Sequence, residues 1–299
     1  MINLGIEKDI SKGSVPGGPL PNLANVGAPI TLVGYGRSGT SLLQSVFDNH
    51  PLFEAAGETT ELIFGSYMAA EAARDTIRWQ LDGQGKEVAH DLRCGEAVRG
   101  ALVGALPSNK PRWMQKPIGL PGLRPYPKEY DPAAGERQPC PADWYWRVLN
   151  NTFPQGRFFT ILRQPCDVVL SSADFWGWKQ PDVWTMLAEH AAIMMHPTAR
   201  LEYAISFDDL LRDTEGELRK LFTRFDVPWH DDVMKAKAVM HVPAPGRTTL
   251  SPQQVSRRDQ WHRLDPTAAQ PWATEIVVAY WKRFGLMFDL PPQFPKFNV

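Results

Sequence analysis

The stretch GYGRSGTSLL, residues 34–43, has the frame of a phosphate-binding loop, G-x-x-x-x-G-[KT]-[ST]. Gly34 and Gly39 bracket four residues, and Ser41 stands where such loops carry a hydroxyl that binds magnesium. A nucleotide-hydrolysing loop would have lysine directly before this serine. The nearby cation here is Arg37, which lies inside the loop itself. The sequence therefore predicts a phosphate site whose cation, Arg37, lies inside the loop and not directly before Ser41.

The segments on either side of the loop indicate a strand and a helix. PITLVGY (29–35) is a short apolar run, and TSLLQSVFDNHP (40–51) places its apolar residues on one helical face. Backbone N–H groups in a glycine-rich turn at the start of a helix bind phosphate without any side chain, and hydroxyl groups add donors. The loop residues expected to bind the anion are Gly36, Arg37, Ser38, Gly39, Thr40 and Ser41.

Composition excludes several classes of protein. The 299 residues are 43% hydrophobic and 22% charged, and the formal net charge is -1, so no basic field for nucleic acid is present. No apolar run is long enough to span a membrane, and the first residues lack a signal-peptide pattern. Three cysteines without metal-ligand spacing suit a reducing compartment. We expect a cytoplasmic protein that binds no nucleic acid and spans no membrane.

Strand-like and helix-like segments alternate beyond the loop. The strand candidates are 112–117, 157–163 and 203–207, and the helix candidates are 60–82, 87–106, 143–154, 213–225 and 273–286. This alternation predicts an α/β fold, a three-layer sandwich in which helices flank a central, mainly parallel sheet with ligands at the carboxyl ends of its strands. We expect residues 1–27 to form an extended or disordered arm and 28–299 to form a single domain. The Pro- and Gly-rich loop 117–142 is a candidate lid.

A second motif also points to an anion. RFFTILRQPCDVVLSS (157–172) predicts a buried strand ending in Arg163, a turn at Pro165 and a helix beginning near Asp167. Arg163 and Ser171 are eight residues apart, so a strand-end guanidinium and a hydroxyl from the helix could converge on one anion. The alternative is a capped helix with a surface salt bridge.

Together, GRSGTSLL and LRQPCDVVLSS resemble two nucleotide motifs of the sulfotransferases that depend on 3′-phosphoadenosine 5′-phosphosulfate (PAPS). The first is similar to their 5′-phosphosulfate loop and the second to their 3′-phosphate site. Other segments resemble the bacterial and Golgi-type branch: DNHP, GETTEL, WMQKP, ISFDDLLRD and RFDVPW. Arginine at position 37 is similar to the tyrosylprotein-type and bacterial enzymes, whereas cytosolic enzymes usually have lysine there. The family fold implied is a P-loop-like α/β sheet.

The resemblance implies in-line transfer of a sulfuryl group from PAPS to a hydroxyl or amine, with 3′-phosphoadenosine 5′-phosphate (PAP) as product and no metal. Arg37 and the loop amides would neutralise the charge that develops on the departing phosphate. Arg163 and Ser171 would bind the 3′-phosphate. A later basic segment closes over this phosphate in the family. Here that segment offers Arg247, Arg257 and Arg258, and the choice among the three stays open.

The acceptor must lose a proton, so a general base is needed within its reach. By resemblance this base is Glu58, in AGETTEL. Glu61, one helical turn further on, is the competing candidate. Glu58 could instead favour the start of a helix at Thr59, because carboxylates stabilise helix N-termini.

Three further residues near these motifs have candidate roles. Lys116, in MQKP, resembles a strand-end lysine that helps hold the transferring group, and the alternative is an exposed lysine without a role. His50, in NHP, is expected to have a turn role. His90 lies in a predicted helix and stays a candidate base without support from a motif.

The acceptor is expected to be a small molecule or a carbohydrate. Trp176 and Trp178 follow the second motif and could shape the acceptor opening, as could the cluster DWYWR (143–147), although aromatic residues at such spacing are more often core. Sugar, phenol, lipid alcohol and peptide tyrosine all stay open as acceptors, and a homodimer stays open as the assembly.

Two other functions fit parts of the pattern. A P-loop kinase for a small molecule would need Mg²⁺ and a carboxylate to hold it, and we see no apolar strand that ends in a suitable aspartate. A non-catalytic nucleotide-binding protein would keep the loop without using the base. Nucleotide preference and the need for Mg²⁺ separate these functions from sulfuryl transfer.

Overall fold

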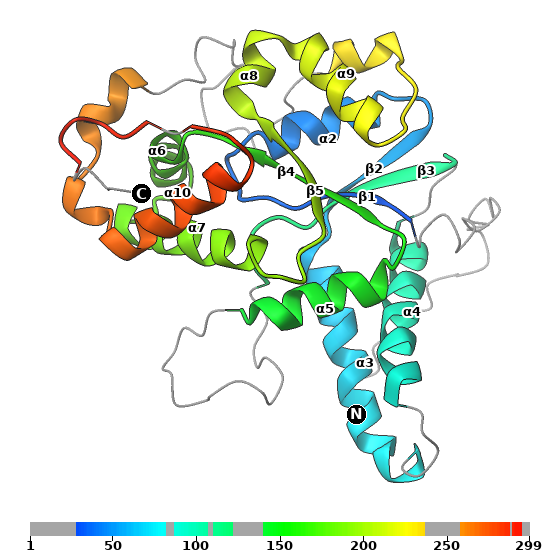
Figure 1. The fold of residues 1–299 in the computed structure, drawn as a ribbon. Helices are drawn as coiled ribbons and strands as arrows, with labels where there is room; N and C mark the ends of the chain where they lie inside the picture. The colour runs from blue at the N-terminus through cyan, green and yellow to red at the C-terminus, as the bar shows by residue number, and fades with distance from the viewer. Residues whose placement is uncertain are drawn as a thin grey trace, which may run out of the picture.

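A computed structural model describes residues 28–81, 87–106, 110–121, 140–236, 258–287 and 289–294. A five-stranded sheet runs through its middle (Figure 1). Its strands are β1 (Ile30–Leu32), β2 (Phe53–Glu58), β3 (Arg112–Lys116), β4 (Arg157–Leu162) and β5 (Leu201–Ser206). The order is β2-β3-β1-β4-β5, and all neighbouring strands are parallel. The predicted α/β fold is confirmed.

The position of β1 in the sheet places the glycine loop. After β1 the chain moves to the edge at β2 and returns through β3, and β4 then lies on the other side of β1. The register pairs Ile30 with Met114 of β3 and with Arg157 of β4. Ligands of open parallel sheets bind where the strand order reverses in this way, beyond the carboxyl ends of the strands. The loop that follows β1 lies at this point.

Helices cover both faces of the sheet (Figure 1). One face carries α2 (Thr40–Asp48), α8 (Phe207–Arg212) and α9 (Thr214–Arg224), and the other carries α5 (Ala142–Thr152), α6 (Pro165–Trp176), α7 (Gln180–Met194) and α10 (Pro271–Arg283). A packed pair, α3 (Thr60–Leu81) and α4 (Glu87–Ala105), projects from the sandwich. The short 3-10 helices of the described residues are η1 (Asp231–Lys235), η3 (Arg258–Arg263) and η4 (Pro266–Ala268). Each face of the sheet has its own apolar core, so the three-layer sandwich is confirmed.

Several sequence predictions need correction. The strand β2 was not predicted, and Glu58 ends this strand, while α3 begins at Thr60 instead of Thr59. Helix α6 begins at Pro165 instead of near Asp167, since proline is well suited to the first helical position. The cluster DWYWR lies in α5, where its two tryptophans are fully buried and belong to the core. Residues 1–27 and the central part of the candidate lid, 122–139, lie outside the described residues.

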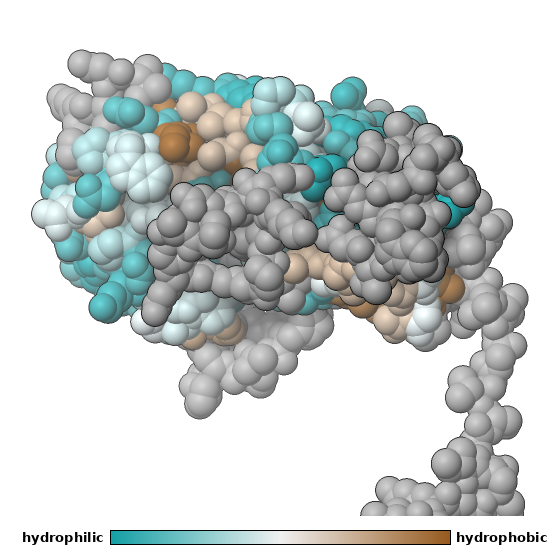
Figure 2. All heavy atoms as spheres, turned by 90° about the horizontal axis from the view of Figure 1, so that it is seen from below, coloured by the Kyte–Doolittle hydropathy of each residue, from teal (hydrophilic) through white to brown (hydrophobic). Residues whose placement is uncertain are grey.

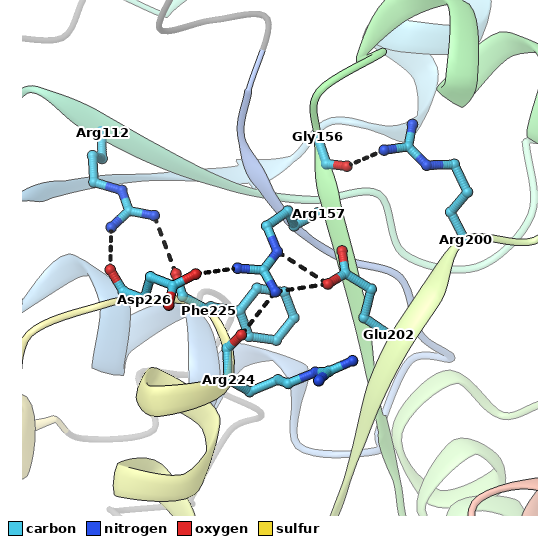
Figure 3. Close-up of polar contacts among 8 residues, drawn as sticks. All are labelled: Arg112, Gly156, Arg157, Arg200, Glu202, Arg224, Phe225 and Asp226. Carbon is cyan, nitrogen blue, oxygen red and sulfur yellow. Dashed lines mark hydrogen bonds and ion pairs between the residues drawn. The ribbon is translucent and has the colours of Figure 1, made fainter.

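An ionic network fastens the end of the sheet opposite the glycine loop (Figure 3). Arg157, at the start of β4, donates to Glu202 of β5 at 2.7 Å and to the Asp226 carboxylate at 2.9 Å. Arg112, at the start of β3, donates to the Asp226 carbonyl at 3.1 Å. Both guanidinium groups lie at the C-terminal end of α9, where unpaired carbonyls and the helix dipole favour a cation. The network therefore ties three strands and a helix together far from the loop.

The outer surface agrees with the composition. Figure 2 shows one face, on which hydrophilic residues are spread widely and apolar residues form separate smaller areas. Within the described residues, no helix is long and apolar enough to cross a membrane.

Candidate functional site

The glycine loop turns sharply between β1 and α2. Arg37 has a φ of 67° and Gly39 a φ of 98°, both in the left-handed region. A Cβ atom on Gly39 would overlap the Phe207 ring, and one on Gly36 would lie 2.6 Å from Cη2 of Trp176. Glycine is therefore required at position 39 by both close packing and the backbone, whereas a side chain at position 36 would displace the exposed end of the Trp176 ring. The loop leads directly into the N-terminus of α2, which has no acidic side chain in its first turn, so the backbone donors there favour an anion.

Arg37 joins the loop to α6. Its Nε donates to the Ser171 hydroxyl at 3.1 Å, and its guanidinium carbon lies 4.2 Å from the centre of the Phe175 ring. Ser171 and Phe175 are one helical turn apart and so share a face of α6. The structure thus brings together two candidate residues that are 134 positions apart in the chain.

Arg163 supports the loop from the end of β4. Its Nη1 donates to the Arg37 carbonyl at 2.8 Å, and its Nη2 lies 3.8 Å from the Asp167 carboxylate. Its guanidinium also lies over the Phe207 ring, 5.1 Å from the ring centre. The ion pair with Asp167 does exist, but its side chains are only 6% and 2% exposed. The alternative of a surface salt bridge is therefore wrong.

Lys116 and Glu58 meet at the carboxyl ends of β3 and β2. The Lys116 ammonium lies 3.4 Å from the Ser41 hydroxyl and 3.9 Å from the Glu58 carboxylate. Lys116 is 1% exposed and Glu58 is 71% exposed, so the alternative of an exposed lysine is wrong. Burial lowers the pKa of Lys116, while the charge of Glu58 opposes this shift. Glu61, not Glu58, is the acidic residue in the first turn of α3.

The site residues described above lie in a region that matches a known protein family. Residues 29–231 match the model of the sulfotransferase family. The chain belongs to the sulfotransferase family. This confirms the resemblance seen in the two nucleotide motifs.

A solved structure agrees with this sulfotransferase in fold, and two others are similar at lower scores. The sulfotransferase domain of the Synechococcus PCC 7002 olefin synthase is similar with a TM-score of 0.53 at 17% identity, over 92% of this chain and 98% of that one. The sulfotransferase domain from the curacin biosynthetic pathway gives 0.48 at 12% identity, over 88% and 99%. Sulfotransferase STF9 from Mycobacterium avium gives 0.46 at 15% identity, over 87% and 77%. None of the curated protein sequences matches significantly.

The other candidate residues of the sulfotransferase are placed as follows. His50 lies in a turn, where its Nδ1 accepts from the Leu52 amide at 3.2 Å and its Nε2 lies 2.8 Å from the Pro228 carbonyl, so it has the turn role expected. Arg258 is exposed and pairs with Asp289 at 2.8 Å. Arg247, Arg257 and the His90 side chain lie outside the part of the chain that the structure describes.

Two exposed tryptophans border the loop. Trp176 and Trp178 are 39% and 40% exposed, and their rings stack with centres 4.3 Å apart. Trp176 contacts Gly36, and its ring centre lies 6.0 Å from the Arg37 guanidinium. An apolar ring surface therefore begins at the loop and continues away from it.

A buried histidine packs behind the loop and was not singled out from the sequence. The His190 ring lies between Tyr35 of the loop and Tyr280 of α10, with ring centres 6.1 Å and 6.5 Å away. Burial lowers the pKa of His190 to about 4, so the ring is neutral at pH 7. Sequence spacing gives no signal for this contact, because the three aromatic rings come from distant parts of the chain.

Phe207, at the start of α8, was also missed. It packs against both Gly39 and Arg163, and so it supports the loop and the strand-end arginine together. Phe175 could have been found, since it lies four residues after Ser171 on the same helical face. Within the described ranges, no group of three His, Cys, Asp or Glu side chains could hold a metal ion. The site thus offers three cations, Arg37, Arg163 and Lys116, around backbone and hydroxyl donors.

Proposed function

We propose that this sulfotransferase moves a sulfuryl group from PAPS to a hydroxyl or amine of a small-molecule or carbohydrate acceptor. The observation that carries the proposal is the junction of the two nucleotide motifs. Arg37 donates to Ser171, and Arg163 donates to the backbone of Arg37. A ligand with anionic groups at two positions can therefore contact both motifs at once, as PAPS requires.

The donor would be held by residues of both motifs. The proposed ligands of the 5′-phosphosulfate are the loop donors Gly36, Arg37, Ser38, Gly39, Thr40 and Ser41. Arg163 and Ser171 are proposed to bind the 3′-phosphate, because both are buried and both are hydrogen-bonded to Arg37, and a guanidinium and a hydroxyl suit a dianion. Arg258 pairs with Asp289, so it would exchange this partner to reach the phosphate. Arg247 and Arg257 remain candidates for closing over it.

Arg37 and Lys116 are proposed to stabilise the transition state. The acceptor oxygen or nitrogen bonds to sulfur while the bond from sulfur to the 5′-phosphate oxygen breaks, so negative charge moves onto that oxygen. Lys116 lies within 3.4 Å of Ser41, and Arg37 lies within the loop that surrounds the phosphate. Fixed cations and amides at this point neutralise the developing charge without reorganisation. This arrangement would work without a metal.

Glu58 is the proposed general base. Its carboxylate is exposed at the carboxyl end of β2 and is held near the loop by Lys116. It would take the proton that the acceptor loses as the new bond to sulfur forms. Glu61 stands at the start of α3, where a carboxylate already has the role of stabilising the helix N-terminus. This difference in position favours Glu58.

The acceptor is proposed to stack on Trp176 and Trp178. Their exposed rings begin at Gly36 and Arg37, so a flat ring resting on them lies beside the phosphosulfate loop. Indole faces bind both aromatic rings and the apolar faces of sugars. We also propose a cytoplasmic location, which the three buried cysteines support because they are present as thiols and not as disulfides.

Mass spectrometry of products tests the proposal. The protein is incubated with PAPS and a library of phenols, sugars, lipid alcohols and tyrosine peptides, with and without EDTA. We expect an acceptor to gain a sulfuryl group at the same rate with EDTA present. Transfer of phosphate from ATP with Mg²⁺ would support the kinase instead. Binding of PAP without transfer to any acceptor would support a non-catalytic role.

A further inference from the structure

Asp167 is a carboxylate enclosed within the protein next to the proposed 3′-phosphate site. It lies in the first turn of α6, and its side chain is 2% exposed. One oxygen lies 3.8 Å from Nη2 of Arg163, and the other accepts the indole N–H of Trp261 at 2.7 Å. A buried carboxylate is costly unless both its charge and its hydrogen bonds are satisfied. Here one partner balances the charge and the other fixes the direction of the carboxylate.

Arg163 depends on this carboxylate for its position. The guanidinium is nearly enclosed, so its charge would be costly without a neighbouring anion. Nη1 of the guanidinium is held by the Arg37 carbonyl, and Nη2 lies next to the Asp167 carboxylate. Because both of these nitrogens have a fixed partner, the guanidinium keeps one orientation.

Trp261 comes from a distant part of the chain and is itself held firmly. It lies in η3, which also donates from Arg263 to Asp174 of α6. Arg258, at the start of η3, pairs with Asp289. The Asp289 amide in turn donates to the Gln164 side chain at 3.1 Å. The segment that carries Trp261 is therefore attached to α6 on both sides of Asp167.

We propose that Asp167 and Trp261 are positioning residues, which hold Arg163 in the orientation that recognises the 3′-phosphate of the donor. Trp261 orients Asp167, and Asp167 orients Arg163. The proposal rests on the proposed function, because it concerns the same nucleotide. It predicts that Trp261, whose N–H donates to Asp167 and not to the nucleotide, controls the preference for nucleotides with a 3′-phosphate.

Trp261→Phe tests this, because it keeps an aromatic ring and removes only the N–H donor. Affinities for PAP and for AMP, which lacks the 3′-phosphate, are measured by isothermal titration calorimetry. We expect the affinity for PAP to fall about tenfold, as for the loss of a hydrogen bond to a charged group, while the affinity for AMP stays the same. Trp272→Phe is the matched control, since Trp272 is exposed on α10, and it should change neither affinity.

Asp167→Asn is a second variant, so the test does not depend on whether Trp261→Phe folds. It should lower PAP affinity at least as much, and adding Trp261→Phe to it should have little further effect, because both act through Arg163. Equal losses for PAP and AMP would show a general structural role and overturn the inference, and so would unchanged PAP affinity in both variants. If the unaltered protein binds PAP no better than AMP, the proposed function itself is wrong.

Discussion

Gly39→Ala is expected to destabilise the glycine loop in two ways that can be separated. The backbone of Gly39 has a φ of 98°, where an L-residue costs about 1–2 kcal/mol. The new methyl group would also overlap the Phe207 ring, and overpacking of this kind costs about 1–3 kcal/mol. The free energy of unfolding should therefore fall by roughly 2–5 kcal/mol.

Two other glycines serve as controls for this experiment. Gly119 has a φ of 69° but open space around its Cβ position, so Gly119→Ala should cost only the backbone part. Gly100 lies in α4 with open space and an ordinary backbone, so Gly100→Ala should raise stability by about 0.5–1 kcal/mol. Urea unfolding followed by tryptophan fluorescence measures all three variants. If Gly39→Ala costs no more than Gly119→Ala, Phe207 does not fix the loop and the packing argument fails.

Three further predictions concern catalysis and acid stability. Glu58→Gln should leave PAP affinity unchanged and lower turnover by about 10² to 10⁴, with Glu61→Gln much milder in the same sulfuryl-transfer assay; an exchange of these effects would make Glu61 the base. Arg37→Ala should lower turnover by roughly 10² to 10³, the range for loss of one transition-state donor, and an effect on donor affinity alone would make Arg37 only a binding residue. The pKa of His190 is lowered to about 4, so the unfolded chain binds its proton first, and the free energy of unfolding should fall by up to about 3 kcal/mol as pH drops from about 6.5 to about 4. His190→Phe should remove this part of the acid dependence in urea titrations, and an unchanged pH profile in that variant would contradict it.

Several elements of the fold could be predicted from local patterns of apolar residues in the sequence. Apolar runs bounded by glycine and proline marked β1 and β4, and helical periodicity marked α2 and α9. The edge strand β2, FEAAGE, has only two buried residues, so its composition gave no strand signal. Its pairing with β3, and not its own sequence, makes it a strand.

The site residues that belong to a sequence motif could be predicted. Residues that reach the site from distant segments of the chain could not. Arg37 and Ser171 were found from their motifs, and they lie in contact. Trp261 and Phe207 act on the motifs from more distant segments, and no spacing rule connects them to Asp167 or Gly39. Such contacts follow from the order of strands and the packing of helices, which a single sequence does not specify.

Recognition of the 3′-phosphate is the central claim, and the stabilisation of the protein by PAP and by ATP tests it most directly. The free energy of unfolding is measured in urea with each nucleotide, for the unaltered protein and for Arg163→Ala. At a PAP concentration 100 times its dissociation constant, the unaltered protein should gain about 2.7 kcal/mol. ATP at the same concentration should stabilise it far less, and Arg163→Ala should remove most of the difference. Equal stabilisation by ATP and PAP would contradict the account.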